Sequence, residues 1–349
     1  MRVGKDLADK SITYLGRKFV TSISKPLTDE EYKEAVDYIM QVPDFKDVEK
    51  ELKALYNGKT KISNITGYYF LHLMYEARNG QDAWSIKEAL SYKPIMEYFN
   101  GKCAVNEKVF PKSQPLGERF KTAFRLCGIR CARKLPQFPI KTIDELLSLY
   151  TKEGDNYYDF SCGWGARMLS TIKNNRNYFG TDPNYKLIDK IKECHTDYNR
   201  INNTNTFIDI RPQGSEIFVE EWENKMNFIF SSPPYFNLEI YKNGKQSCDE
   251  NTNYSDWLND WMKPTVNNIY KYLKDDGVFA INIKDIIMNK TKYSLEKDTI
   301  DIITASGFEL IDVKELKNIK RTFGSVHWEK HTTGVSDKAD EHIFVFKKK

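Results

Sequence analysis

The chain has 349 residues, a formal net charge of +4, 40% hydrophobic residues and 13% aromatic residues. This composition supports a sizeable core and excludes an extended disordered protein. No apolar run approaches the roughly 18 residues that span a bilayer, and the N-terminal sequence MRVGKDLADK lacks the apolar stretch of a signal peptide. We expect a globular protein that works in the cytoplasm and has no membrane partner.

The six cysteines of the sequence form no CxxC pair. A structural zinc site normally uses two such pairs, or one pair together with histidines. We therefore expect reduced thiols and no bound metal.

The N-terminal part of the chain carries helical patterns and no glycine-rich loop. In the segment LTDEEYKEAVDYIMQ (27–41), Thr28 is followed three residues later by Glu31, the spacing of a capping box. A second amphipathic segment, 84–99, contains Pro94, which should break or kink it. We expect residues 1–135 to form a mainly helical auxiliary region.

A basic stretch closes this region. From Lys108 to Lys134 there are eight basic residues, one acidic residue and three phenylalanines. Basic side chains with interleaved aromatics suit a surface that follows phosphates, although a solvated helix face explains the pattern equally well. The candidate nucleic-acid contacts are Lys112, Arg119, Lys121, Arg125, Arg130, Arg133 and Lys134.

From about residue 142 the pattern changes to strands that alternate with helices, which favours a largely parallel sheet wrapped by helices. The expected strands are Tyr157–Ser161, Tyr178–Thr181, Thr206–Ile210, Met226–Phe230, Val278–Ile283, Phe308–Leu316 and His342–Lys347. The expected helices include Tyr185–Ile201, Trp257–Leu273 and Leu295–Ser306. The polar segments 236–253 and 318–341 are long enough to be recognition loops.

Two glycines follow the first expected strand in YYDFSCGWGARMLS (157–170). Gly163 and Gly165 let the backbone approach a ligand, and the helix after them offers unpaired N–H groups. The nearby Cys162 is interpreted as a small packing residue rather than a nucleophile.

An acidic residue, Asp182, ends the next expected strand, 19 residues after Gly163. An acid at that place can accept hydrogen bonds from both hydroxyls of a ribose, although it can also simply cap the turn TDPN. After the third strand, Asp209, Ser215 or Glu216 could reach an adenine. The absence of a G-x-x-x-x-G-K-[ST] loop favours a nucleoside without a pyrophosphate.

The fourth strand ends abruptly in NFIFSSPPY (227–235). Prolines carry no N–H, so the carbonyls beside them can accept hydrogen bonds from a substrate. Ser232 adds a hydroxyl acceptor and Tyr235 a flat face, a combination that suits a planar ring with an exocyclic amine. Taken alone, a Ser-Pro-Pro corner is more often a turn than a site.

In their order and spacing, DFSCGWG (159–165), TDPN (181–184) and SSPPY (231–235) resemble motifs I, II and IV of the S-adenosylmethionine-dependent DNA amino-methyltransferases. These are the N4-cytosine and N6-adenine methylases. The resemblance covers about residues 136–349, and residues 1–135 match no motif of the family. It implies a Rossmann-like α/β fold, a seven-stranded methyltransferase sheet with helices on both faces.

The resemblance also implies the roles of the motif residues. The implied cofactor contacts, for S-adenosylmethionine, are Asp159, Ser161, Gly163, Gly165, Asp182 and Ser215. The implied catalytic residues, which hold the flipped target base, are Ser232, Pro233, Pro234 and Tyr235. Ser215 stands where many members carry an acid, and Ser161-Cys162 replaces Pro-Phe.

The implied activity is transfer of a methyl group to a base in double-stranded DNA, and the resemblance allows a cognate restriction endonuclease as a second partner. A serine at the first position of motif IV is commoner among N4-cytosine enzymes, so N4 of cytosine is favoured over N6 of adenine. RNA or a protein glutamine as the substrate, and a non-catalytic nucleic-acid-binding protein of the same fold, remain alternatives.

Overall fold

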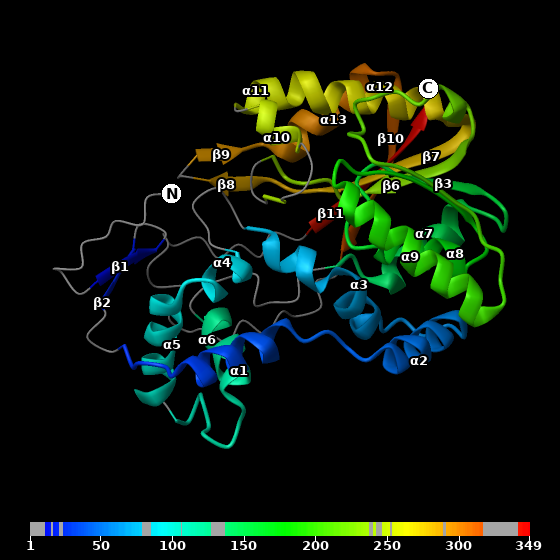
Figure 1. The fold of residues 1–349 in the computed structure, drawn as a ribbon. Coiled ribbons are helices and arrows are strands. Elements are labelled where there is room, and N and C mark those ends of the chain that lie inside the picture. The colour runs from blue at the N-terminus through cyan, green and yellow to red at the C-terminus, as the bar shows by residue number, and fades with distance from the viewer. Residues whose placement is uncertain are drawn as a thin grey trace. The chain divides into compact units, whose positions relative to one another are not determined.

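The computed structural model describes residues 11–14, 17–20, 24–78, 85–105, 107–126, 137–236, 240–241, 246–251, 253–288, 291–316 and 341–349 (Figure 1). These residues form two compact units. The first unit contains the described residues up to 44, those of 70–126, and residues 240–241. The second contains residues 45–69, 137–236 and the described residues from 246 onwards. The predicted domain boundary between residues 135 and 136 stays a prediction.

The first unit is mainly helical, as predicted for the N-terminal part of the chain. Its elements are β1 (Ser11–Tyr14), β2 (Arg17–Val20), α1 (Asp29–Met40), α4 (Ile86–Leu90), α5 (Lys93–Val105), α6 (Leu116–Leu126) and the end of α3 (Ser63–Glu76). The antiparallel pair of β1 and β2 was not predicted.

Local sequence signals set the ends of these helices. The side chain of Thr28 accepts a hydrogen bond from the Glu31 N–H, and Glu31 accepts one from the Thr28 N–H, which confirms the predicted capping box. The segment 84–99 is broken as predicted, because α4 ends at Leu90 and Pro94 lies in the first turn of α5.

The core of the first unit is built around aromatic side chains of α5 and α6. The Phe99 ring lies edge-on to the Phe124 ring with centroids 4.9 Å apart, and Phe120 stacks beside Phe124. A Cβ atom placed on Gly117 would lie 2.6 Å from the ring of Tyr38, so this glycine lets α6 pack closely against α1.

The second unit holds the strands and helices of the predicted α/β domain. Its strands are β3 (Asn156–Asp159), β4 (Asn177–Thr181), β5 (Ile208–Arg211), β6 (Met226–Ser231), β7 (Leu273–Ile283), β8 (Ile286–Met288), β9 (Thr291–Tyr293), β10 (Phe308–Leu316) and β11 (Glu341–Lys348). Its helices include α2 (Phe45–Tyr56), α7 (Ile140–Tyr150), α8 (Ala166–Lys173), α9 (Tyr185–Asn202), α10 (Ser247–Glu250), α11 (Tyr254–Asp256), α12 (Lys263–Tyr272) and α13 (Leu295–Ala305).

The described residues of this unit form a seven-stranded mixed sheet in the order β10-β11-β7-β6-β3-β4-β5. The strands from β5 to β7 in this order are parallel, and β11 runs antiparallel to both of its neighbours, β7 and β10. This is the predicted Rossmann-like methyltransferase sheet. The chain builds outward from β3 in one direction and then, from β6, in the other, so the topological switch point lies between β3 and β6.

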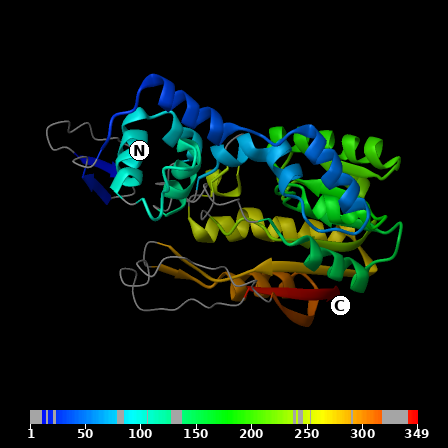
Figure 2. The ribbon, with the colours of Figure 1, turned by 90° about the horizontal axis from the view of Figure 1, so that it is seen from below.

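Helices cover both faces of the sheet. α7, α8 and α9 lie on one face, and α12 and α13 lie on the other (Figure 1). Figure 2 shows β11, in red, alongside the orange and yellow strands β10 and β7. The central strands are buried on both sides, which explains why β6 reads as an almost continuous apolar run, from Met226 to Phe230.

Some elements differ from the predicted ones. The predicted helix Trp257–Leu273 is found as a π-helical turn η5 (Trp257–Met262) followed by α12, and the short α11 directly precedes it. The short antiparallel pair of β8 and β9 was not predicted, because strands of three residues leave too little alternation to detect.

Candidate active site

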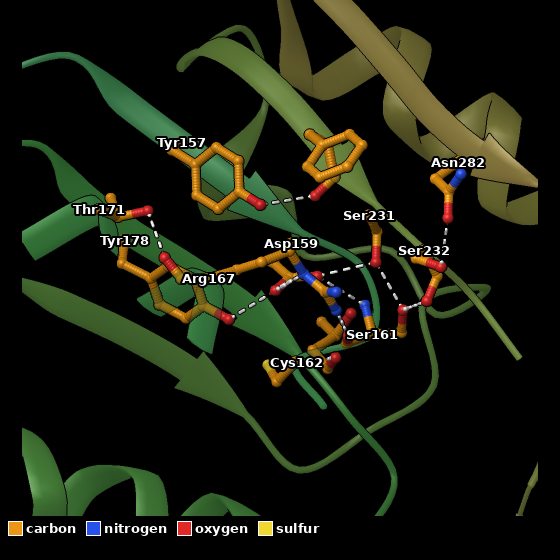
Figure 3. A network of polar contacts seen from close by, with 12 residues as sticks. Tyr157, Asp159, Ser161, Cys162, Arg167, Thr171, Tyr178, Ser231, Ser232 and Asn282 are labelled. Carbon is orange, nitrogen blue, oxygen red and sulfur yellow. Dashed lines mark hydrogen bonds and ion pairs between the residues drawn. The ribbon is translucent and has the colours of Figure 1, made fainter. Parts of the chain in front are cut away.

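Two strand ends that are distant in the sequence meet at the switch point. The hydroxyl oxygens of Ser161, after β3, and Ser231, at the end of β6, lie 2.5 Å apart. Because Ser231 gives its proton to Asp159, Ser161 Oγ is the donor in this contact, and it also lies 3.4 Å from the main-chain oxygen of Ser232. Figure 3 shows these serines between β3 and β6. The two principal sequence motifs are therefore joined by direct hydrogen bonds.

The carboxylate of Asp159 is the centre of this network and is fully buried. It accepts hydrogen bonds from Arg167 Nε at 2.7 Å, Tyr178 OH at 2.9 Å and Ser231 Oγ at 2.8 Å. Arg167 also donates to the main-chain oxygen of Ser161. Burial alone lowers the pKa of Arg167, but the adjacent Asp159 carboxylate, together with Tyr157 and Tyr178, holds that pKa above its ordinary value. The predicted contact of Asp159 with the cofactor stays a prediction.

The glycine turn after β3 has a backbone conformation that favours glycine. Gly163 and Gly165 have φ angles of +54° and +75°, in the left-handed region that other residues avoid. Gly165 is the N-cap of α8, and no side chain caps this helix end. The turn therefore presents main-chain N–H groups at the positive end of a helix dipole.

Asp182 lies directly after β4, as expected. Its Oδ1 accepts a hydrogen bond from the Asn184 N–H at 3.0 Å. Part of its surface stays exposed, yet burial by the surrounding protein raises the pKa of its carboxyl to about 7, against hydrogen bonds from the main chain of Asn184 and Gly163 that lower it. The last of these bonds links Asp182 to the glycine turn.

Cys162 packs beneath this turn. Its Sγ lies 3.4 Å from the Thr181 carbonyl, and a Cβ atom on Gly180 would come within 2.6 Å of it. Burial raises the pKa of the thiol well above its ordinary value. A buried protonated thiol fits the predicted packing role.

Ser215 lies in the segment after β5 and is buried. Its hydroxyl is 2.9 Å from the hydroxyl of Thr265, and its carbonyl accepts a hydrogen bond from Asn268 at 3.0 Å. These bonds attach Ser215 to α12. Its predicted contact with the cofactor remains a prediction.

The Ser-Pro-Pro-Tyr corner after β6 is fixed by β7. Ser232 Oγ donates to Asn282 Oδ1 at 3.0 Å, and Tyr235 OH donates to the same oxygen at 3.3 Å. Pro233 is buried, whereas Ser232, Pro234 and Tyr235 are half-buried. Asn282 was not predicted, although an asparagine inside the apolar run VFAINI of β7 was a usable signal, because buried polar side chains normally have a specific partner.

The predicted nucleic-acid contacts divide into described and undescribed residues. Lys112 is exposed and pairs with Glu107 at 2.5 Å, while Arg119 is half-buried on α6. Lys121 lies over the Tyr38 ring, 4.7 Å from its centroid, and burial lowers its pKa. Only the backbone of Arg125 is described, and Arg130, Arg133 and Lys134 lie outside the described residues.

The predicted recognition loops are also covered incompletely. Segment 318–341 lies outside the described residues apart from the backbone of its last residue, and 236–253 is described in part. The described residues contain no cluster of three or more metal-ligating side chains. Among the helices of the described residues, none is long and apolar enough to cross a membrane.

Comparison with known proteins gives one family match, over the C-terminal third of the chain. Residues 226–349 match the model of the DNA methylase family of N6 and N4 amino-methyltransferases. No curated protein matches the chain significantly.

Several solved structures are similar in fold at low sequence identity. A TehB-like SAM-dependent methyltransferase from Corynebacterium glutamicum has a TM-score of 0.40 and 15% identity, covering 66% of this chain and 100% of that one. TrmN from Thermus thermophilus has a TM-score of 0.40 and 13% identity, covering 68% of this chain and 54% of that one.

A third similar structure is the 1,6-didemethyltoxoflavin-N1-methyltransferase from Burkholderia thailandensis, with bound 1,6-didemethyltoxoflavin and S-adenosylhomocysteine. It has a TM-score of 0.37 and 10% identity, covering 60% of this chain and 77% of that one. The family match, which rests on sequence, is independent of these structures. It agrees with the resemblance predicted from the motifs, because residues 226–349 match the DNA methylase model.

Proposed function

We propose that this protein is a DNA methyltransferase that transfers a methyl group to the exocyclic amine of a flipped base, with N4 of cytosine favoured and N6 of adenine as the alternative. The observation that carries the proposal is the contact between Ser161 and Ser231, 2.5 Å between hydroxyl oxygens. It joins the end of the glycine-turn strand to the strand that delivers Ser-Pro-Pro-Tyr.

The donor and acceptor chemistry around the glycine turn fits S-adenosylmethionine. The carboxylate of Asp182 can accept hydrogen bonds from two ribose hydroxyls. The left-handed turn at Gly163 and Gly165 and the uncapped start of α8 suit the carboxylate of an amino acid. When bound, S-adenosylmethionine supplies the methyl group.

The chain's own residues would bind and orient the target amine. Such an amine is a poor nucleophile because its lone pair is delocalised into the ring. Hydrogen bonds from its two N–H groups to Ser232 Oγ and the Pro233 carbonyl would favour a localised lone pair, and the ring of Tyr235 would stack on the base. Catalysis would then rest on positioning and electrostatics, without a covalent enzyme intermediate.

Main-chain partners support this assignment of acceptors. The carbonyl of Pro234 accepts a hydrogen bond from the Phe236 N–H at 3.1 Å, and the carbonyl of Ser232 lies 3.4 Å from Ser161 Oγ. The Pro233 carbonyl lies between these two in the chain. We assign it, together with Ser232 Oγ, to the amine.

Double-stranded DNA is the proposed partner, and a restriction endonuclease of the same sequence specificity is its proposed counterpart in the cytoplasm. In the first unit, the exposed Lys112 and the half-buried Arg119 are the described members of the proposed phosphate-binding set. We propose that residues 1–135 serve as the auxiliary region and residues 136–349 as the methyltransferase domain.

The test is incubation of the purified full-length protein with labelled S-adenosylmethionine and DNA of mixed sequence, followed by mass spectrometry of the nucleosides. We expect N4-methylcytosine, and N6-methyladenine would identify the alternative target. RNA and a glutamine-containing peptide are tested in parallel. Label in RNA or peptide but not in DNA would overturn the proposal.

A further inference from the structure

Asn282 is a buried polar residue in the apolar strand β7, and it is 1% exposed. Its side chain contacts two residues of the Ser-Pro-Pro-Tyr corner, Ser232 and Tyr235, and the main chain of β11. Figure 3 shows Asn282, on the neighbouring strand β7, directed at Ser232 just beyond the end of β6. None of the predicted catalytic roles uses this residue.

The hydrogen bonds determine which way the Asn282 amide faces. Its Nδ2 donates to the carbonyl oxygen of His342 at 2.8 Å. A carbonyl oxygen can only accept, so the NH₂ group must point to His342 and the amide oxygen must point to the corner. The two hydroxyls at that oxygen, Ser232 at 3.0 Å and Tyr235 at 3.3 Å, must therefore both donate to it.

This arrangement commits the single proton of the Ser232 hydroxyl. A hydroxyl has one donor and two acceptor lone pairs. With its proton held by Asn282, Ser232 Oγ can offer only lone pairs to a ligand. An exocyclic amine can donate to those lone pairs, whereas a carbonyl oxygen in the same place would meet another acceptor.

We propose that Asn282 is a positioning residue that fixes Ser232 as a hydrogen-bond acceptor, so that the site selects a base with an exocyclic amine and rejects one with a carbonyl oxygen there. This inference rests on the proposed function. The backbone of His342 in β11 holds Asn282, Asn282 holds Ser232, and Ser232 reads the edge of the base. Such discrimination is strong because the wrong base leaves polar groups of the site without hydrogen-bond partners.

The test compares two DNA duplexes built around the methylated position that the nucleoside assay and sequencing identify. One carries the natural target base, and the other carries the analogue whose amine is replaced by oxygen, uracil for cytosine or hypoxanthine for adenine. Binding of both is measured with S-adenosylhomocysteine present, which has no methyl group to transfer. Comparing the ratio of the two affinities between variants cancels the different ease of opening the two base pairs.

We expect Asn282→Leu to lower the amine-to-carbonyl affinity ratio by about tenfold, because a freed Ser232 hydroxyl can rotate and donate to the carbonyl. Asn282→Asp keeps an acceptor oxygen for Ser232, and because burial favours the protonated carboxyl, its OH can replace Nδ2 as the donor to the His342 carbonyl. This variant should therefore keep the ratio, a rescue that a merely structural role does not predict. Ser232→Ala should lower the ratio as Asn282→Leu does. When Asn282→Leu is added to Ser232→Ala, the ratio should change no further.

Asn227 provides a matched control. Its amide oxygen also accepts two hydrogen bonds, from the Asn156 N–H and Lys274 Nζ, both at 3.1 Å, but it lies near the opposite end of β6. Asn227→Ala should leave the ratio unchanged.

Two results separate this inference from the proposed function. A wild-type protein that methylates no DNA overturns both. A wild-type protein that methylates DNA, with the same affinity ratio in Asn282→Leu as in wild type, overturns the role of Asn282 alone. If Asn282→Leu does not fold, the other two variants decide. A lowered amine-to-carbonyl affinity ratio in Asn282→Asp, or an unchanged ratio in Ser232→Ala, would also overturn the role of Asn282.

Discussion

Ser161 and Ser231 stand 70 residues apart in the sequence, and their hydroxyl oxygens lie 2.5 Å apart in the structure. Both also connect to Asp159, through the Ser161 N–H at 3.3 Å and the Ser231 hydroxyl at 2.8 Å. Because β3 and β6 are neighbours at the switch point, this one carboxylate positions the ends of both strands. The geometry of the glycine turn and of the Ser-Pro-Pro-Tyr corner is therefore coupled through Asp159.

Replacing Arg167 by methionine should destabilise the second unit strongly. The change leaves the buried carboxylate of Asp159 without its cationic partner, and breaking a buried pair in this way costs about 3–5 kcal/mol. Denaturant unfolding measures the loss. Adding Asp159→Asn should reduce it, because no buried charge then remains unpaired.

The control for Arg167 is Lys190, whose ion pair with Glu193 lies on the exposed side of α9. Removing such a surface pair changes the free energy of unfolding by about 0–1 kcal/mol. Similar losses of unfolding free energy in Arg167→Met and Lys190→Met would contradict the claim that burial makes the Arg167–Asp159 pair costly to break.

The affinity for S-adenosylmethionine should depend on the ionisation of Asp182. Burial raises the pKa of its carboxyl to about 7. The ionised carboxylate is the better acceptor for two ribose hydroxyls, so affinity should fall by up to about tenfold for each pH unit below that pKa. Calorimetric titrations at several pH values measure this. Asp182→Asn should bind weakly with little pH dependence, and an equally steep pH profile in that variant would assign the titration to another group.

The same raised pKa has the opposite effect on stability. The folded protein holds a proton on Asp182 over a range of pH in which the unfolded chain, with an ordinary carboxyl pKa of 3.8, has released it. Between about pH 4 and pH 7 the folded state therefore binds more protons, and this residue's contribution to stability falls as the pH rises. Between pH 4 and pH 7, the free energy of unfolding should fall more steeply with rising pH in wild type than in Asp182→Asn. Denaturant unfolding at several pH values measures this, and equal slopes in the two proteins would contradict the prediction.

The sequence predicted local features well. The apolar runs of the central strands, the glycine turn at residues 163–165 and the capping box of Thr28 all depend on residues close together in the chain. The pattern also placed Asp182 correctly after its strand.

Features that depend on distant pairing could not be predicted from the sequence. The bonds of Arg167 to Asp159 cross from helix to strand, and those of Asn282 join β7 to the corner after β6. Their geometry follows from strand order and register, which a single sequence does not specify. A buried polar residue could be recognised in the apolar run of β7, but its partner could not.

Gly163→Ala should combine a general loss of stability with a specific loss of cofactor affinity. A residue with a Cβ atom costs about 1–2 kcal/mol in the left-handed conformation of this glycine. The altered turn would also misplace the N–H groups proposed to face S-adenosylmethionine. Gly154 is a matched control, because its φ is +83° and a Cβ atom there would meet nothing within 4 Å. Gly154→Ala should lose similar stability and keep cofactor affinity, and a parallel loss of affinity in both variants would remove Gly163 from the site.

Tyr235→Ala should weaken binding of the flipped base by about 1–3 kcal/mol, the usual value of stacking a base on an aromatic ring. Tyr235→Phe keeps the ring and loses only the hydroxyl that donates to Asn282, so most of the affinity should remain. Steady-state kinetics with DNA as the varied substrate measure the loss of affinity in each variant. Fluorescence of a 2-aminopurine placed at the target reports how the flipped base is stacked. If Tyr235→Phe loses as much affinity as Tyr235→Ala, the ring does not stack on the base.

Lys112→Ala should reduce the salt dependence of DNA binding. Its ion pair with Glu107 is exposed and therefore weak, so the ammonium group can exchange that partner for a phosphate. Each phosphate contact that is lost lowers the slope of log K against log salt concentration by about 0.9. Fluorescence anisotropy over a range of salt concentrations measures the slope. Lys297, which pairs with Asp301 on the exposed surface of α13, is the matched control, and Lys297→Ala should leave the slope at its wild-type value. Equal slopes in wild type and Lys112→Ala would show that Lys112 makes no phosphate contact and would move the proposed DNA surface elsewhere.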